Sequence, residues 1–328
     1  MPLIDMPLAE LQTYAPEVAE PEDFDAFWSD TVREVAAHDL APDVVPVDNK
    51  LALVDTYDVT YAGYGSDPVR AWLHVPAGTS TALPTVVQYH GYSRGRGFPH
   101  SDTLWAQAGY AHLVMDTRGQ GWSSGGRSES ADSGSGPGHT PGLMTAGILD
   151  PSTYYYRRVY VDALRLLEVA RTHPLLDERR MVVTGGGQGG GLAIAAAGLA
   201  PTVGIELLGA APDVPFLCHF ARAVALTDRH PYREIAQYLA GWRDHADAAF
   251  RTLSYVDGVN LAKRAVAPAL FSVALMDLTC PPSTVYAAYN HYRGADKRIN
   301  VYPYNDHEGG EAYQVAAQLD WVAERFAA

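Results

Sequence analysis

Short apolar runs alternate with amphipathic segments along most of this chain. Segments 51–61 and 69–75 place apolar residues at every second position around a glycine-containing turn, which predicts an antiparallel hairpin. Later apolar runs are too short for helices and predict buried strands, whereas apolar residues spaced three and four apart predict helices. The predicted strands cover 51–61, 69–75, 85–89, 111–115, 180–183, 203–208, 269–275 and 299–302, and the predicted helices cover 151–173, 192–199, 281–291, 311–326 and a segment beginning near residue 21.

Strands that alternate with helices indicate an α/β fold, with a mostly parallel twisted sheet flanked by helices on both faces. The opening hairpin is expected to form an antiparallel edge of this sheet. Residues 212–264 are helical in pattern and contain no clear strand, which predicts a helical insertion over the carboxyl edge, where ligands bind in open α/β sheets. No repeat or linker divides the chain, so residues 1–328 are expected to form one domain that contains this insertion.

The most informative segment is 182–191, Val-Val-Thr-Gly-Gly-Gly-Gln-Gly-Gly-Gly, which lies between a predicted strand and a predicted helix. Its shape is that of a nucleophile elbow, Gly-x-Ser-x-Gly, with Gly187 at the position of the serine. Side chains at Gly185 and Gly189 would clash in so tight a turn. The chain therefore has the frame of an esterase without the attacking atom.

An acyl-transfer site also needs an acid and a histidine, which follow the nucleophile in that order in such folds. Asp277 follows the strand 269–275 directly, and His307 follows the last predicted strand. The alternatives are a turn or cap role for Asp277 and a solvated loop position for His307. A metal site formed by Asp306, His307 and Glu308 is disfavoured, because adjacent side chains rarely converge on one ion.

An oxyanion hole is expected in the loop after the early strand 85–89, where His90-Gly91-Tyr92 lies. Backbone N–H groups of Tyr92 and Gln188 would donate to the same oxygen, where negative charge develops in the transition state. The alternative is an ordinary turn between a strand and a helix, with a core histidine.

Composition excludes several other classes of function. The net charge is −14 and the chain contains no basic cluster, so no nucleic acid partner is expected. No apolar run reaches the length of a membrane span, and the two cysteines form no disulfide framework, so a reduced compartment fits. The first residues lack the basic and apolar regions of a signal peptide, and a cytoplasmic location is therefore expected.

Together these motifs resemble carbohydrate esterase family 7, the acetyl xylan esterases and cephalosporin C deacetylases of the α/β-hydrolase superfamily. The resemblance covers nearly the whole chain, and its most specific parts are the Arg-Gly-Gln and His-Glu sequences. The segments that carry it are Phe24 to Trp28, Tyr57 to Tyr64, His90 to Tyr92, Asp116 to Gly121, Gly185 to Gly189, Met276 to Asp277, Cys280 to Val285, Ala288 to Tyr292, and His307 to Glu308.

The resemblance implies an α/β-hydrolase fold, no cofactor or metal, and removal of acetyl groups from small acetylated sugars and cephalosporin C. It implies a serine triad at position 187, Asp277 and His307, with the Tyr92 and Gln188 amides as the oxyanion hole. Tyr92 and Phe216 would contact the substrate. The group Arg118, Gly119, Gln120 and Glu308 would anchor the site without carrying protons.

A ring-like homohexamer is also implied by the resemblance. Two sequence features bear on it: the expected sheet edge at the hairpin, and an apolar N-terminal segment, each of which would pack either on a neighbouring subunit or on its own domain. The apolar residues of that segment are Leu3, Ile4, Met6, Leu8 and Leu11.

Gly187 is the one departure from the family pattern. One explanation is an engineered substitution that stops hydrolysis. The other is a natural loss, which would leave a binding protein or an enzyme with different chemistry. The retention of Asp277, His307 and the glycine frame favours the engineered substitution.

Overall fold

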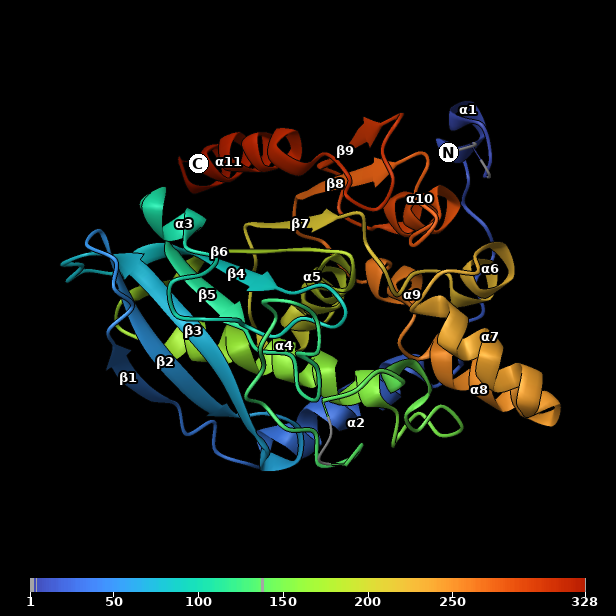
Figure 1. Ribbon diagram of the computed structural model, residues 1–328, viewed down its shortest axis with the longest axis horizontal. Helices are drawn as coiled ribbons and strands as arrows, with labels where there is room; N and C mark the ends of the chain where they lie inside the picture. The colour runs from blue at the N-terminus through green and yellow to red at the C-terminus, as the bar shows by residue number, and fades with distance from the viewer. Residues whose placement is uncertain (1–2, 4, 137–138, 328) are drawn as a thin grey trace.

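A nine-stranded sheet runs through the whole molecule, with the strand order β1-β2-β3-β5-β4-β6-β7-β8-β9 (Figure 1). The computed structural model describes residues 3, 5–136 and 139–327, so Ile4 lies outside it. Strands β4 to β9 pair in parallel, whereas the pairs β1–β2, β2–β3 and β3–β5 are antiparallel, which confirms the predicted fold class. The strands are β1 Asp43–Val47, β2 Val54–Ala62, β3 Pro68–Pro76, β4 Leu83–Tyr89, β5 Ala111–Met115, β6 Leu176–Gly186, β7 Gly209–Asp213, β8 Ala269–Ala274 and β9 Lys297–Tyr302.

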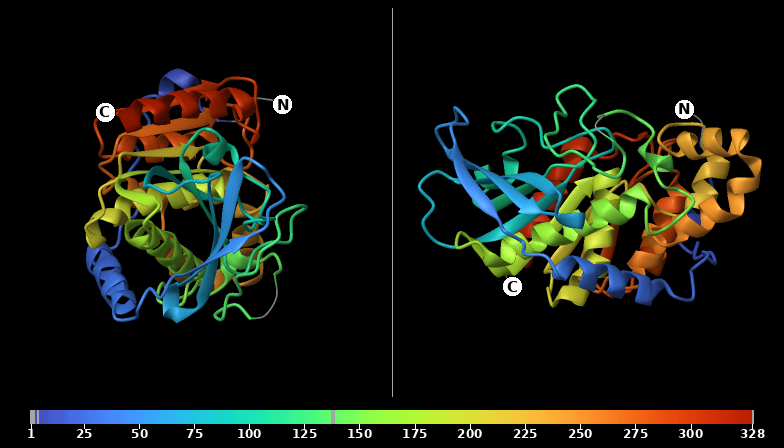
Figure 2. Two further views of the ribbon diagram at one scale, coloured as in Figure 1. Left: turned by 90° about the vertical axis from the view of Figure 1, so that its left-hand side faces the viewer. Right: turned by 90° about the horizontal axis from the view of Figure 1, so that it is seen from below.

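Helices cover both faces of the sheet, and the left panel of Figure 2 shows α11 on one side with α2 and α4 on the other. A smaller core joins α3 and α11 to the sheet through Trp105 and Trp321. The larger core lies on the opposite face, where all twelve residues of α5 are buried because glycine and alanine allow close packing. The helices are α1 Leu8–Leu11, α2 Phe24–Ala36, α3 Leu104–Gln107, α4 Tyr155–Thr172, α5 Gln188–Leu199, α6 Phe220–Leu226, α7 Tyr232–Gly241, α8 Ala246–Ser254, α9 Gly258–Ala262, α10 Pro282–His291 and α11 Glu311–Ala327.

The predicted strand at 203–208 is wrong. Residues Ala200–Val203 form a short 3-10 helix that ends at Gly204, and the strand β7 begins only at Gly209. Strand β7 has the sequence Gly-Ala-Ala-Pro-Asp, and a Cβ atom at Gly209 would lie 2.3 Å from the ring of Trp321. Small residues are therefore required where α11 crosses the strand, and they conceal the strand from a search for large apolar residues.

The hairpin is present as β2 and β3, but it is not the sheet edge that the sequence predicted. Strand β1 pairs along the outer side of β2, with Asp43 opposite Thr60, and is itself the edge. Pro46 and the exposed positions of β1 are typical of an edge strand.

The described part of the N-terminal segment packs on its own domain. Leu11 is fully buried, and Met6 and Leu8 contact the same core, whereas Leu3 is exposed. Neither this segment nor the hairpin therefore needs a neighbouring subunit to cover it.

Helices α6 to α9 occupy most of residues 212–264 and lie on the side toward which the arrowheads of β7, β8 and β9 point (Figure 1). Asp257 caps α9 by accepting a hydrogen bond from the Val259 N–H. The single domain and the limits of the insertion stay predictions. Within the described residues, no helix has both the length and the apolar character needed to cross a membrane.

Three histidines, His74, His90 and His112, are buried near one another in the sheet and at the end of β4. His74 and His112 are direct partners on β3 and β5, and His90 follows β4. Burial lowers the pKa of His74 and of His90 from 6.5 to about 4, against the opposing charge of Asp102. Burial also holds the pKa of His112 well below 6.5.

These histidines should make the fold sensitive to acid. Because their pKa values are lower in the folded than in the unfolded chain, unfolding takes up protons between pH 6.5 and about 4. The free energy of unfolding should therefore fall as the pH decreases through this window, by up to about 1.4 kcal/mol per pH unit for each histidine. Urea denaturation at a series of pH values measures the slope. His74→Gln should reduce it and the exposed-site control His38→Gln should not; equal slopes would contradict the assignment.

Candidate active site

The turn between β6 and α5 has the backbone of a nucleophile elbow. Gly187 has φ 56° and ψ −118°, a conformation that residues with side chains rarely adopt. The elbow packs tightly, because a Cβ atom at Gly189 would lie 2.1 Å from the Tyr89 carbonyl oxygen, and one at Gly185 would lie 2.5 Å from the same atom. Side chains at Gly185 and Gly189 would therefore clash with the backbone, as the sequence predicts.

His307 points at position 187. A Cβ atom built on Gly187 would lie 3.0 Å from His307 Nε2, and the ring would need to shift only slightly to accommodate it. The other ring nitrogen, Nδ1, lies 2.9 Å from Asp277 Oδ2. Asp277 is fully buried, and its second oxygen accepts hydrogen bonds from the Thr279 and Cys280 N–H groups. Position 187, His307 and Asp277 therefore form one aligned row.

Carboxylates on three sides favour the protonated form of His307. Burial lowers its pKa, but the hydrogen bond and charge of Asp277, with the charges of Asp213 and Asp306, outweigh burial and raise the pKa above 6.5. Asp306 is balanced by Arg229 at 2.5 Å and accepts a hydrogen bond from the Leu278 N–H. This bond joins the loop of His307 to the loop of Asp277.

The residues of the two predicted oxyanion donors line one cavity together with His307. Within the described residues, the backbone N–H groups of Tyr92 and Gln188 donate to no other protein group. The side chain of Gln120 bridges the two segments: it accepts from the Ser93 N–H at 2.7 Å and donates to Gln188 Oε1 at 2.7 Å. Gln120 therefore connects the loop after β4 to the start of α5.

A cavity of about 700 Å³ lies in front of His307. Of the predicted site residues, Tyr92, Gln188, Phe216 and His307 line it, whereas Asp277 is buried behind His307. The aromatic rings of Trp122 and Phe216 flank that of Tyr92, with centroids 5.3 and 6.5 Å from it. The remaining lining residues are Gly91, Ser93, Trp122, Pro141, His230, Pro231, Glu234 and Thr279.

Arg118, Gly119 and Glu308 do not line this cavity. Arg118 is fully buried and donates two hydrogen bonds to Asp162, at 2.5 and 2.8 Å. Gly119 has φ 70° and follows directly in the same loop. Glu308 accepts hydrogen bonds from the Asn305 side chain and the Asp306 N–H, which shapes the turn around His307.

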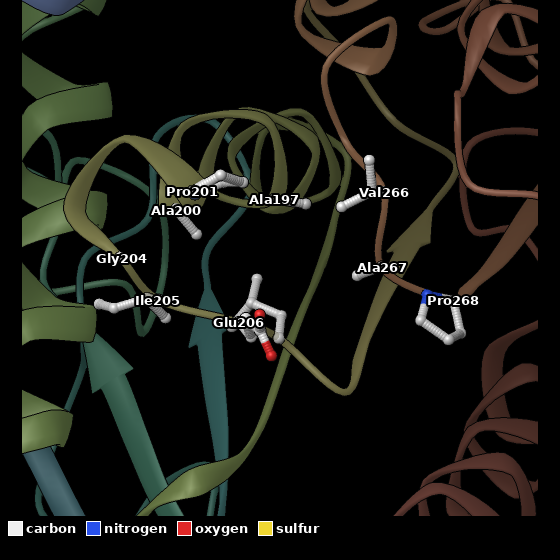
Figure 3. Close-up of a pocket in the computed structure, with 10 residues that line it drawn as sticks. Ala197, Ala200, Pro201, Gly204, Ile205, Glu206, Val266, Ala267 and Pro268 are labelled. Atoms are coloured by element: carbon white, nitrogen blue, oxygen red, sulfur yellow. The ribbon is translucent and has the colours of Figure 1, made fainter.

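A second cavity, of about 400 Å³, lies at the C-terminal end of α5, whereas the elbow lies at the N-terminal end of this helix (Figure 3). Its lining is apolar apart from Glu206, whose carboxylate faces the space. It offers no paired acid and base, so the chemistry belongs to the cavity in front of His307.

One group of potential metal ligands occurs within the described residues. Ligand atoms of Asp277, Cys280 and His307 lie within 4.8 Å of one another. The His307–Asp277 hydrogen bond already uses two of these side chains, and Cys280 is brought near by the turn that follows Asp277. Asp306 and Glu308 are not members of this group.

Comparison with known proteins decides the family. The acetyl xylan esterase family model matches residues 1–325. The chain belongs to the acetyl xylan esterase family. An acetyl xylan esterase from a Paenibacillus species has 40% identity and a TM-score of 0.89 over 97% of this chain and 99% of its own. Another, from a Thermoanaerobacterium species, has 31% identity and a TM-score of 0.88 over 98% and 99%.

A more distant relative is longer than this chain. An acetyl esterase from Xylanibacter ruminicola has 25% identity in a match 322 residues long, which covers 89% of this chain and 64% of the relative. The chain thus spans less than two thirds of that protein. An acylaminoacyl peptidase from Pyrococcus horikoshii, with 17% identity and a TM-score of 0.57, shares the α/β-hydrolase fold alone.

Asp213 was missed in the sequence. It ends β7, its carboxylate accepts a hydrogen bond from Ser272, and its backbone oxygen accepts one from the Gly187 N–H at 3.0 Å. Burial raises the pKa of its carboxyl group, while Ser272 and His307 oppose the shift. An acid at the carboxyl end of a strand was the pattern that identified Asp277, but the misplaced strand at 203–208 concealed it here.

Replacing Asp277 should lower the pKa of His307. In Asp277→Asn the main group that opposes burial is lost, and the pKa should fall by about one to three units. An NMR titration of the imidazole signals in the Gly187 chain measures the midpoint without any need for turnover. Asp306→Asn is the matched control and should have a smaller effect, because Arg229 already balances Asp306. An unchanged midpoint in Asp277→Asn would refute the coupling.

Proposed function

We propose that this site is that of a carboxylesterase which removes acetyl groups from small acetylated substrates through a Ser-Asp-His triad, with serine at position 187. The observation that carries the proposal is the row formed by position 187, His307 and Asp277. His307 Nε2 would lie 3.0 Å from a Cβ atom built at position 187, and His307 Nδ1 lies 2.9 Å from Asp277 Oδ2. The chain's family and its relatives named acetyl xylan esterases support acetyl ester hydrolysis.

In the serine form, the reaction follows from the geometry. His307 Nε2 takes the proton of the serine hydroxyl as its oxygen attacks the acetyl carbon, and Asp277 holds the ring and stabilises the imidazolium. The backbone N–H groups of Tyr92 and Gln188 donate hydrogen bonds to the negatively charged oxygen of the tetrahedral intermediate. His307 then returns the proton to the departing alcohol. Water hydrolyses the acetyl-serine by the same steps and releases acetate.

The substrates that we propose are acetylated xylo-oligosaccharides and cephalosporin C. A cavity of about 700 Å³ suits a small molecule, and the rings of Tyr92 and Phe216 offer an apolar wall near the acyl group. No cofactor or metal enters this mechanism. A cytoplasmic location stays a prediction.

The chain with Gly187 is proposed to be largely inactive. Without a hydroxyl at position 187, no acyl-enzyme forms, and the remaining catalysis comes from binding and the oxyanion hole. The same feature supports a second function, binding of acetylated sugars without turnover, because every other part of the site is retained.

Restoring the nucleophile separates these functions. Gly187→Ser should hydrolyse an activated phenyl acetate at least about 10³-fold faster than the Gly187 chain. Mass spectrometry after treatment with an acylating inhibitor should also show one covalent adduct at position 187 of this variant.

The matched control is Gly187→Ala, which adds a Cβ atom but no hydroxyl and should stay inactive. A folded Gly187→Ser protein without activity on any acetyl ester would contradict the esterase and leave sugar binding as the function.

We also propose that the chain assembles as a homohexamer. The proposal rests on the family resemblance, since the hairpin is covered by β1 and the described N-terminal residues pack on their own domain. Light scattering coupled to size exclusion should give six times the mass of one chain at micromolar concentration, and a monomer would refute the assembly.

A further inference from the structure

The cavity in front of His307 contains a buried acidic side chain that the esterase mechanism does not use. Glu234 lies on α7, is only 9% exposed, and lines the same cavity as His307. Acidic side chains are seldom this buried without a cationic partner. In the part of the chain that the structure describes, no lysine or arginine forms an ion pair with Glu234, and its nearest basic group is His230 Nδ1 at 4.0 Å.

The hydrogen bonds of Glu234 leave one of its oxygens underused. The Tyr92 hydroxyl donates to Oε1 at 3.0 Å and to Oε2 at 3.1 Å, and the Met144 N–H donates to Oε2 at 3.1 Å. A carboxylate has about four positions that accept hydrogen bonds. Because Oε1 only shares the proton of Tyr92, it retains the capacity to accept a hydrogen bond from a molecule in the cavity.

The described wall of the cavity supplies no lysine or arginine to balance the charge of Glu234. Its basic side chains are His230, whose Nδ1 lies 4.0 Å from Glu234, and His307, which is hydrogen-bonded to Asp277. Burial raises the pKa of the Tyr92 hydroxyl, and the charge of Glu234 raises it further, which keeps this hydroxyl a donor to the carboxylate. The cavity therefore presents a hydrogen-bond acceptor with negative charge to whatever occupies it.

We propose that Glu234 determines which alcohol the site accepts. Its Oε1 accepts a hydrogen bond from a hydroxyl group of the acetylated molecule, and its charge disfavours molecules that carry a carboxylate. This inference rests on the proposed function in one respect, namely that the acetylated substrate binds in the cavity in front of His307. Of the two substrate groups proposed above, it selects neutral acetylated sugars over cephalosporin C, which carries carboxylates.

The test uses two acetylated sugars that differ in one charge. They are a methyl glucopyranoside with a single acetyl group and the corresponding methyl glucuronide, which has a carboxylate at C6. The Gly187 chain has no nucleophile, so calorimetry measures the affinity for each intact ester. The neutral sugar should bind at least roughly tenfold more tightly, and Glu234→Gln should bring the two affinities to within about twofold.

A control variant separates the charge of Glu234 from a general change of protein charge. Glu178→Gln removes the same charge at an exposed position and should retain the preference for the neutral sugar. Equal affinities in the Gly187 chain, an unchanged preference in Glu234→Gln, or no binding of either sugar would overturn the proposal.

Kinetics in the Gly187→Ser background distinguish this inference from the esterase itself. There the ratio of kcat/KM values for the two sugars should fall in Glu234→Gln by the same factor as the ratio of affinities. If the Gly187→Ser protein shows no turnover but its binding preference depends on Glu234, the proposed esterase function is contradicted and the role of Glu234 is supported. If the Gly187→Ser protein is active but Glu234→Gln leaves the ratio of kcat/KM values unchanged, the proposed role of Glu234 is contradicted and the esterase function is not.

Discussion

The close contact between the end of β4 and the start of α5 is the constraint on which the site depends. The Tyr89 carbonyl oxygen occupies the space that side chains at Gly185 and Gly189 would fill. This approach brings the loop of Tyr92 beside the first N–H of α5, so that the two predicted oxyanion donors come from segments far apart in the sequence. The Gln120 side chain then fixes their separation by bonding to both segments. Backbone packing thus sets the geometry before any reacting group is considered.

The carboxylates around His307 are the second feature on which the site depends, because they favour its protonated form. Asp213 ends β7 and Asp277 follows the neighbouring strand β8, and both are largely buried, whereas Asp306 lies on the same loop as His307 and is balanced by Arg229. Because the strands run in parallel, their carboxyl ends deliver acids to one edge of the sheet. The result is a histidine whose protonated form is favoured despite its burial. Glu234 belongs to a different element, α7, and lines the cavity in front of that histidine.

The sequence predicted the parts of this arrangement that follow local rules. The elbow, Asp277 and His307 were found because strand ends and glycine spacing leave clear patterns, and the parallel sheet followed from alternating elements. Strand β7 and hence Asp213 were missed, since packing against Trp321 requires small residues and removes the usual pattern of a strand. Strand β1 was missed because an edge strand with Pro46 buries little. Glu234 left no pattern at all, because its importance lies in its burial in the cavity wall without a lysine or arginine partner among the described residues, which only the folded chain reveals.

Gly187 also bears on the stability of the elbow. Glycine adopts a φ of 56° at little cost, whereas a residue with a side chain held in such a conformation costs about 1–3 kcal/mol. An enzyme with serine here would store that strain in its fold. The chain with glycine therefore avoids the backbone strain that an esterase with serine carries at its nucleophile. This is a trade-off between stability and activity at a single residue.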